Sequence, residues 1–98
     1  MIEHIVLFKM KQGVTEQQRT EFIEALKALR HNVPGILELT AGRNLNEERS
    51  QGYEIALLVR FGDKNSLDAY GPHPAHQDVV QKYVLPWCES VIVADYEA

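Results

Sequence analysis

A phenol and two imidazoles fall within seven residues of one another, in the segment Tyr70-Gly71-Pro72-His73-Pro74-Ala75-His76. Pro74 is typical of the first turn of a helix, so the segment predicts a helix entrance. His76 precedes Val79 and Val80 by three and four residues, a spacing that puts side chains on one helix face. Because histidine can act as an acid or a base near neutral pH, an inward His76 beside the Tyr70 hydroxyl would form a proton-transfer pair.

A third imidazole, that of His4, lies in an alternating segment over residues 2–10, on the same side as Val6 and Phe8. If helices cover that side, His4 and His76 face one cavity from opposite walls, and His73 lies nearer solvent at the helix cap. We therefore expect His76, Tyr70 and His4 to carry any chemistry. The residues expected to contact a ligand are Val6, Phe8, Phe22, Leu26, Ile55, Leu57 and His73.

Structural roles for these histidines are equally open at this point. A histidine near a helix start often caps backbone groups or hydrogen-bonds a buried phenol, and His4 can be a core residue. Imidazoles also suit zinc, copper or nickel, but no Asp or Glu stands beside His73 and His76 to complete a site. We expect neither a metal nor a cofactor.

The remaining reactive residues are expected to be structural. The single cysteine, Cys88, stands in an apolar neighbourhood, where a thiol is usually inert packing. Asp95 and Tyr96 are expected to make contacts at the end of a strand, and Tyr83 and Trp87 to lie in the core.

Alternation of apolar and polar residues predicts strands over residues 2–10, 36–43, 53–61 and 89–96. Thr15 and Gln18 form a capping box at the start of a helix that runs to about Asn32. Asp63 caps a short helix that ends near Tyr70, and a third helix extends from Pro74 to about Trp87. The polar residues 44–52 are expected to form an exposed loop.

This order, βαββααβ, predicts one α+β domain over residues 1–98, with a ferredoxin-like four-stranded antiparallel sheet. Several strands are apolar on both faces, and the helices can cover only one. Large aliphatic side chains left in water would forgo about 1.5–3 kcal/mol each. We therefore expect a homodimer through the sheet face. The residues expected on that face are Ile5, Leu7, Leu39, Leu58 and Ile92.

Composition limits the possible partners and compartment. The chain is 45% hydrophobic and 24% charged, with a formal net charge of −4 and scattered basic residues. This distribution disfavours nucleic acid. Apolar runs are too short for a membrane span or a signal peptide, so no membrane association is expected. The single cysteine fits a reducing compartment, and we expect a cytoplasmic protein.

Taken together, these residues resemble the stress-responsive dimeric α/β-barrel (Dabb) domains along essentially the whole chain. The matching positions include the opening residues 4–9, Pro34-Gly35-Ile36, Gly42-Arg43-Asn44, Gly52-Tyr53, Tyr70, His73-Pro74-Ala75-His76 and Asp95-Tyr96. The resemblance implies a ferredoxin-like monomer whose sheet packs on that of its mate to form a barrel.

The resemblance also implies roles for the site residues, because one plant member is a cofactor-free polyketide cyclase. By that likeness His76 would be the general base, Tyr70 a hydrogen-bond donor to His76 or a developing enolate, and His4 a substrate contact. Ile55 stands where the cyclase has a further histidine, which makes this pocket more apolar.

Three classes of function remain open. The first is a dimer that binds a small apolar or carbonyl ligand without catalysis. The second is a cofactor-free enzyme, similar to the polyketide cyclase, that uses the His/Tyr pair for proton transfer. The third is a monooxygenase acting on a quinol or haem, as in related dimeric barrels.

Overall fold

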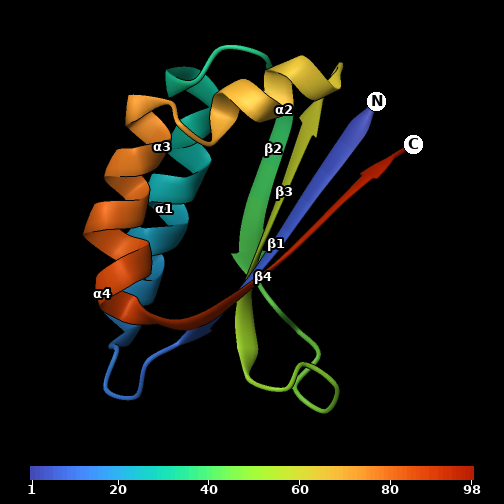
Figure 1. Cartoon of the computed structure of the whole chain (residues 1–98). Coiled ribbons are helices and arrows are strands. Elements are labelled where there is room, and N and C mark those ends of the chain that lie inside the picture. Colours follow the sequence, from blue (N-terminus) through green and yellow to red (C-terminus); the bar gives the residue numbers. More distant parts are fainter.

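The computed structural model describes all 98 residues and contains four strands. They are β1 (Ile2–Met10), β2 (Ile36–Arg43), β3 (Tyr53–Phe61) and β4 (Cys88–Glu97). The first three match the predicted ranges, and β4 is one residue longer at each end. Between β2 and β3 the chain forms the expected exposed loop, which extends beyond the sheet in Figure 1.

The helices are α1 (Glu16–Asn32), α2 (Lys64–Tyr70), α3 (Pro74–Val79), η1 (Val80–Val84) and α4 (Leu85–Trp87). The start of α1 confirms the capping box, because the Thr15 hydroxyl accepts from the Gln18 amide at 3.1 Å and the Gln18 side chain accepts from the Thr15 amide at 2.8 Å. Asp63 caps α2 by accepting from the Ser66 amide at 2.8 Å.

The third predicted helix is not uniform. The sequence predicts an unbroken helix from Pro74 to Trp87, but the five residues of η1 adopt a π-helical turn between α3 and α4. The amide of Leu85 bonds the carbonyl of Val80, five residues back, where an α-helix would use a carbonyl four residues back.

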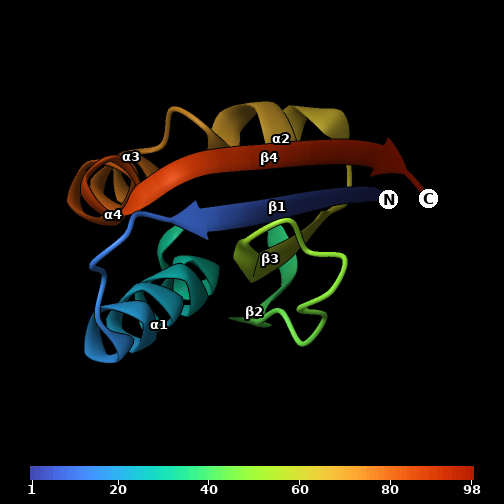
Figure 2. The ribbon, with the colours of Figure 1, turned by 90° about the horizontal axis from the view of Figure 1, so that it is seen from below.

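The sheet has the strand order β2-β3-β1-β4, and every neighbouring pair is antiparallel. The helices form one layer against one face of this sheet, with α1 on the β2 side and α3 on the β4 side (Figures 1 and 2). The domain is therefore α+β with the ferredoxin-like topology, as predicted.

The core lies between α1 and the inner face of the sheet. Phe22, Leu26 and Leu29, at helical spacing on α1, are at most 2% exposed. They pack with apolar residues of the sheet that are also almost fully buried, namely Val6, Phe8, Leu39, Ile55, Leu57, Val59 and Phe61.

The opposite side of the sheet, which we call the outer face, is mostly apolar and has no helix over it (Figure 2). It comprises outward residues of three strands: Glu3, Ile5, Leu7, Ala56, Leu58, Arg60, Ile92, Ala94 and Tyr96. Leu58 is 39% exposed and Ile92 is 46% exposed. The expectation that Leu39 lies on this face was wrong, because a register shift between Ile36 and Glu38 pairs Leu39 with Val59, on the inner face.

None of the helices is long and apolar enough to cross a lipid bilayer.

The capping box makes a testable contribution to stability. Replacing Thr15 with Ala leaves the Gln18 amide without its side-chain acceptor, and we expect the free energy of unfolding to fall by about 0.5–2 kcal/mol. Thr15→Ser keeps the hydroxyl and should change little. Thr20→Ala makes the same chemical change at an exposed position within α1 and is the matched control. Urea unfolding measures all three, and an equal loss for Thr20→Ala would contradict this account.

Candidate functional site

The turn between α2 and α3 positions the predicted phenol and imidazoles. Tyr70 is the last residue of α2, and the amide of His73 bonds back to the Tyr70 carbonyl at 3.2 Å. His73 is the N-cap of α3, with its Nδ1 accepting from the Ala75 amide at 3.1 Å. Pro74 occupies the first turn, as expected, so the side chain of His76 emerges from the start of α3 beside Tyr70.

His76 is held by the turn that precedes its helix. Its Nδ1 lies 2.9 Å from the carbonyl oxygen of Gly71. A carbonyl only accepts, so Nδ1 carries the proton and Nε2 keeps a free lone pair when the ring is neutral. Burial lowers the pKa of His76, and the nearby His4 and His73 lower it further, against the opposing effect of the Gly71 bond. The site therefore favours a neutral imidazole with Nε2 available as an acceptor.

Tyr70 lies beside His76, with the two ring centroids 4.4 Å apart. The residue is 2% exposed, and its hydroxyl is buried without a hydrogen-bond partner in the protein. Burial raises the pKa of this phenol well above its ordinary value. Tyr70 therefore presents a protonated, unpaired hydroxyl donor to its surroundings.

His4 reaches the same place from β1, with its ring 5.6 Å from that of Tyr70. Its Nδ1 lies 2.5 Å from the Asp95 carboxylate, which stands directly opposite His4 on β4. A carboxylate that accepts from Nδ1 fixes the orientation of the ring and leaves Nε2 for other contacts. The His4 side chain is only 12% exposed, so this imidazole faces the interior.

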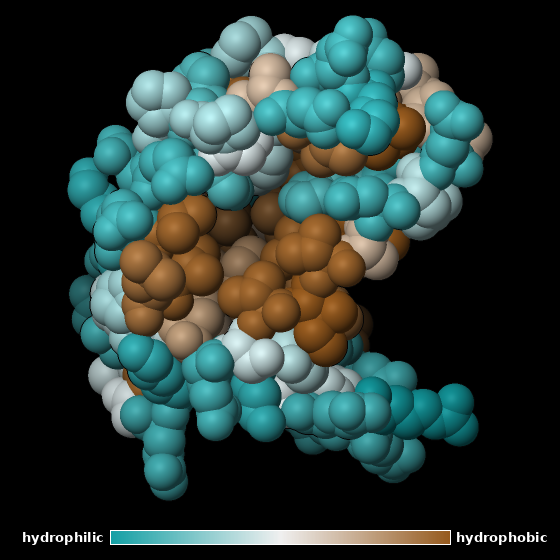
Figure 3. All heavy atoms as spheres, viewed as in Figure 1, coloured by the Kyte–Doolittle hydropathy of each residue, from teal (hydrophilic) through white to brown (hydrophobic).

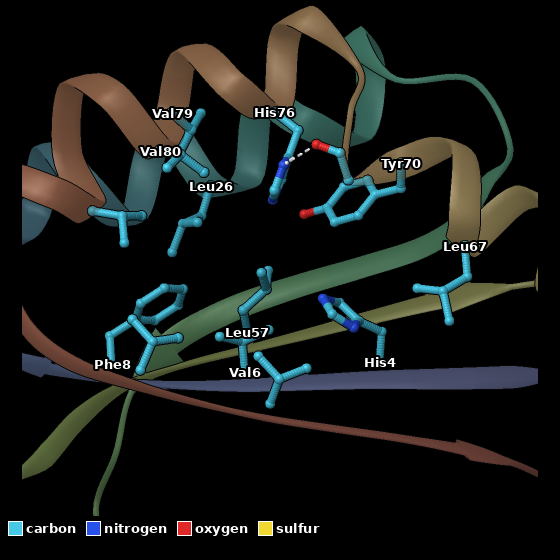
Figure 4. A pocket seen from close by; sticks show the side chains of 14 residues that line it. His4, Val6, Phe8, Leu26, Leu57, Leu67, Tyr70, His76, Val79 and Val80 are labelled. Carbon is cyan, nitrogen blue, oxygen red and sulfur yellow. Dashed lines mark hydrogen bonds between the residues drawn. The ribbon is translucent and has the colours of Figure 1, made fainter.

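These three side chains lie around a cavity of about 250 Å³ between the helix layer and the sheet. Figure 3 shows apolar side chains gathered around this hollow, and Figure 4 shows His76 and Tyr70 pointing into it from above and His4 from below. Eleven of the fourteen lining residues are hydrophobic. The full lining is His4, Val6, Phe8, Leu26, Leu57, Leu67, Tyr70, Gly71, His76, Val79, Val80, Val84, Val91 and Val93.

Seven of the ten residues predicted for the site line this cavity: His4, Val6, Phe8, Leu26, Leu57, Tyr70 and His76. The other three do not. Phe22 is fully buried between Phe8, which it meets edge-to-face at a centroid distance of 4.9 Å, and Tyr83, on which it stacks at 6.0 Å. Ile55 is also fully buried, on the β3 side of Phe8 and away from β4. His73 is engaged in capping α3.

Sequence reasoning missed several lining residues and one positioning residue. Val91 and Val93 of β4 line the cavity, yet they are 40% and 53% exposed because no helix covers this part of β4. The sequence does carry a signal for them, because Val91 and Val93 alternate with Ile92 and so must lie on the opposite face of β4 from it. The sequence predicts only a strand-end contact for Asp95. Its partnership with His4 depends on the β1–β4 register, which a single sequence does not give.

The remaining reactive groups lie away from the cavity. Cys88 is buried, with its sulfur 3.8 Å from that of Met10, and burial raises the pKa of its thiol to about 11. Such a thiol is protonated at neutral pH and is a poor nucleophile. No three His, Cys, Asp or Glu side chains gather in an arrangement that could hold a metal ion.

Comparison with known proteins agrees with this architecture. The profile of the stress responsive A/B barrel domain matches residues 2–98. The chain belongs to this family. Among its relatives is a stress-response A/B barrel domain-containing protein of Arabidopsis thaliana, 32% identical over 98 residues. The match covers 100% of this chain but only 37% of the Arabidopsis protein, so the chain spans about a third of that relative.

Two further proteins are similar over nearly their whole length. Olivetolic acid cyclase of Cannabis sativa is 26% identical over 96 residues, which cover 97% of this chain and 94% of the cyclase. A crystal structure from Bacteroides fragilis, described as a dimeric protein of unknown function with a ferredoxin-like fold, is 30% identical, with a TM-score of 0.83. That match covers 99% of this chain and 95% of the other. The chain is thus similar along nearly its whole length both to a cyclase and to a dimeric protein of unknown function.

The lowered pKa of His76 makes the stability of this A/B barrel domain depend on pH. The unfolded chain binds a proton at His76 more readily than the folded chain does. The stabilising contribution is therefore complete above the ordinary pKa of 6.5 and is lost as the pH falls through the lowered folded value. We expect the free energy of unfolding to decrease between pH 7 and 5.5, with a smaller decrease in His76→Asn, whose amide can still donate to the Gly71 carbonyl.

Urea unfolding across this pH range measures the effect. His31→Asn, at the exposed end of α1, is the control and should keep the wild-type dependence. The same slope in wild type and His76→Asn would show that His76 titrates alike in the folded and unfolded chains.

Proposed function

We propose that this protein is a homodimer in which each subunit binds a small, mostly apolar molecule bearing a carbonyl or similar acceptor oxygen in the helix–sheet cavity. The observation that carries the proposal is the Tyr70 hydroxyl, which is buried at the cavity without a hydrogen-bond partner. Leaving such a donor unpaired costs about 1–3 kcal/mol. An oxygen placed in the cavity would recover that free energy.

The residues that line the cavity indicate that most of the ligand is apolar. Apart from His4, Tyr70 and His76, the cavity is lined almost entirely by aliphatic side chains and Phe8. A pocket of this kind, apolar with a few convergent polar groups, is typical of small-molecule sites. Its volume of about 250 Å³ lies just below the range of about 300–1,000 Å³ usual for such sites, which favours a small ligand.

Dimerisation through the outer face is part of the proposal. Leu58 and Ile92 are substantially exposed there, and a continuous aliphatic surface of this kind is unusual on a monomer. Glu3 pairs with Arg60 at 2.6 Å on the same face, but its second carboxylate oxygen is buried without a partner. A second copy would cover the aliphatic side chains and offer donors to Glu3. The similar Bacteroides fragilis protein is described as dimeric.

A second candidate function is cofactor-free proton transfer on a carbonyl compound in the same cavity. His76 favours this reading, because its Nδ1–H is tied to the Gly71 carbonyl and Nε2 remains as a base beside the Tyr70 hydroxyl. Nε2 would take a proton from the carbon next to a carbonyl, and the hydroxyl would donate to the developing enolate oxygen. Asp95 would hold the His4 ring in place. The 26% identity to olivetolic acid cyclase supports the same reading.

Binding is tested with 2-heptanone, a carbonyl compound with an apolar chain. We expect saturable binding, detected by calorimetry or by chemical shifts of cavity methyl groups. Tyr70→Phe removes the donor and should weaken the affinity about tenfold, equivalent to about 1.4 kcal/mol. Tyr83→Phe, outside the cavity lining, is the matched control and should bind as the wild type does. Absence of wild-type binding to this ketone and to its shorter and longer homologues would overturn the ligand proposal.

The same samples in heavy water separate the two functions. An enzyme that removes a proton next to a carbonyl should speed the exchange of hydrogen for deuterium at carbons 1 and 3 of the bound ketone. His76→Asn keeps a donor to the Gly71 carbonyl but lacks a basic nitrogen, so exchange should fall to the background rate while binding remains. Binding without wild-type exchange would favour the non-catalytic function.

Dimerisation is tested by sedimentation at micromolar concentration. Leu58→Asp places a charge in the proposed interface and should shift the protein to a monomer. Leu85→Asp is the matched control, because Leu85 is also exposed, at 57%, but lies in α4 rather than on the outer face. A monomeric wild type, or a Leu58→Asp variant that stays dimeric, would remove the outer face from the proposal.

A further inference from the structure

The π-helical turn η1 lies in the wall of the cavity. Within it the Leu85 amide bonds the Val80 carbonyl, five residues back. Pro86 follows directly. Proline has no N–H to donate, and its ring would collide with the Lys82 carbonyl in a regular α-helix. A π-turn is wider than an α-turn and so acts as a local insertion of one residue in the helix.

This insertion changes which side chains face the cavity. His76, Val80 and Val84 all line it, at intervals of four residues. In an uninterrupted α-helix each residue advances by about 100°, so a residue eight positions after His76 would be rotated about 80° away from it. The residue seven positions after His76, which is Tyr83, would instead lie within about 20° of it. The extra residue in the π-turn rotates Val84 back onto the helix face that carries His76.

Tyr83 is correspondingly turned away from the cavity. Its ring stacks on Phe22 of α1, with centroids 6.0 Å apart and an interplanar angle of 22°, and makes an edge contact with Trp87 at 5.1 Å. Together with Ala25 and Leu29 it lines a separate groove between α1 and α3. An uninterrupted helix would therefore exchange a valine for a tyrosine in the cavity wall, and a tyrosine side chain would occupy much of the space.

We propose that the π-turn η1 makes position 84 the size-determining wall of the cavity, by placing Val84 where an α-helix would place Tyr83. This inference rests on the proposed ligand site and specifies what limits the ligand. The polar groups of the cavity, on β1, α2 and the start of α3, fix one end of the ligand. Val84, two helical turns beyond His76, bounds the space left for its apolar part.

The experiment measures the affinities of 2-pentanone, 2-heptanone and 2-nonanone for the wild type and three variants. We expect Val84→Ala to raise the ratio of nonanone to pentanone affinity at least about threefold, and Val84→Phe to lower it at least about tenfold. Tyr83→Phe keeps the aromatic stack and should leave the ratio within about twofold of the wild type. Unchanged ratios in both Val84 variants, or a larger change in Tyr83→Phe, would overturn the inference.

A measurement without ligand keeps this test independent of the proposed function. In the wild type, NMR should detect scalar coupling across the hydrogen bond from the Leu85 amide to the Val80 carbonyl, and a nuclear Overhauser effect between the rings of Tyr83 and Phe22. Coupling to the Gln81 carbonyl instead would indicate an α-turn and overturn the inference. A wild type that shows the π-turn but binds none of the ketones would overturn both the proposed ligand class and the role of Val84 in selecting it.

Discussion

The cavity exists because β4 and α3 are supported by different neighbours. β4 is an edge strand held by its pairing with β1, and α3 packs on α1. The two elements run on the same side of the molecule, but Val91 and Val93 on the inner side of β4 remain about half exposed. A helix pressed against these valines would bury them and fill the hollow. The open cavity therefore leaves these two valines without the stabilising free energy that full burial would give.

The polar groups around this gap are held before any ligand arrives. The imidazole of His76 is fixed by the Gly71 carbonyl and that of His4 by the Asp95 carboxylate, so each ring has one nitrogen occupied. Only the Tyr70 hydroxyl is left without a partner. Because the three residues come from different elements, their relative positions depend on the whole fold. Such preorganisation reduces the ordering cost of binding and is equally useful to a binding protein and to an enzyme.

Features of the fold and the site that depend on residues close together in the sequence were predictable, and features that depend on strand register were not. The boundaries of β1, β2 and β3, the Thr15 cap and the entrance at Pro74 depend on neighbouring residues, and the sequence predicts them correctly. The convergence of His4 with His76 also follows, because strand alternation and helical spacing both point them inward. The pairing of His4 with Asp95 and the inward position of Leu39 depend on strand register, which alternation alone does not determine.

The π-turn escaped prediction for a different reason. The sequence places the end of this helix correctly near Trp87, but the five-residue turn before α4 leaves no distinct pattern of residue types. Val79, Val80, Tyr83, Val84 and Trp87 fit an α-helical stripe well enough to conceal the change of register.

Because β1 is central, the same short strand serves both sides of the sheet. His4, Val6 and Phe8 face the cavity, whereas Glu3, Ile5 and Leu7 belong to the outer face. Anything that orders the outer face therefore restricts the backbone that carries His4. Neighbouring residues of β4 likewise face opposite sides of the sheet: the Asp95 carboxylate is turned toward His4, and Ala94 is turned toward the outer face. If two copies pack through their outer faces, the edge strand β4 gains support that its own helices do not provide, while its inner valines remain free to contact a ligand.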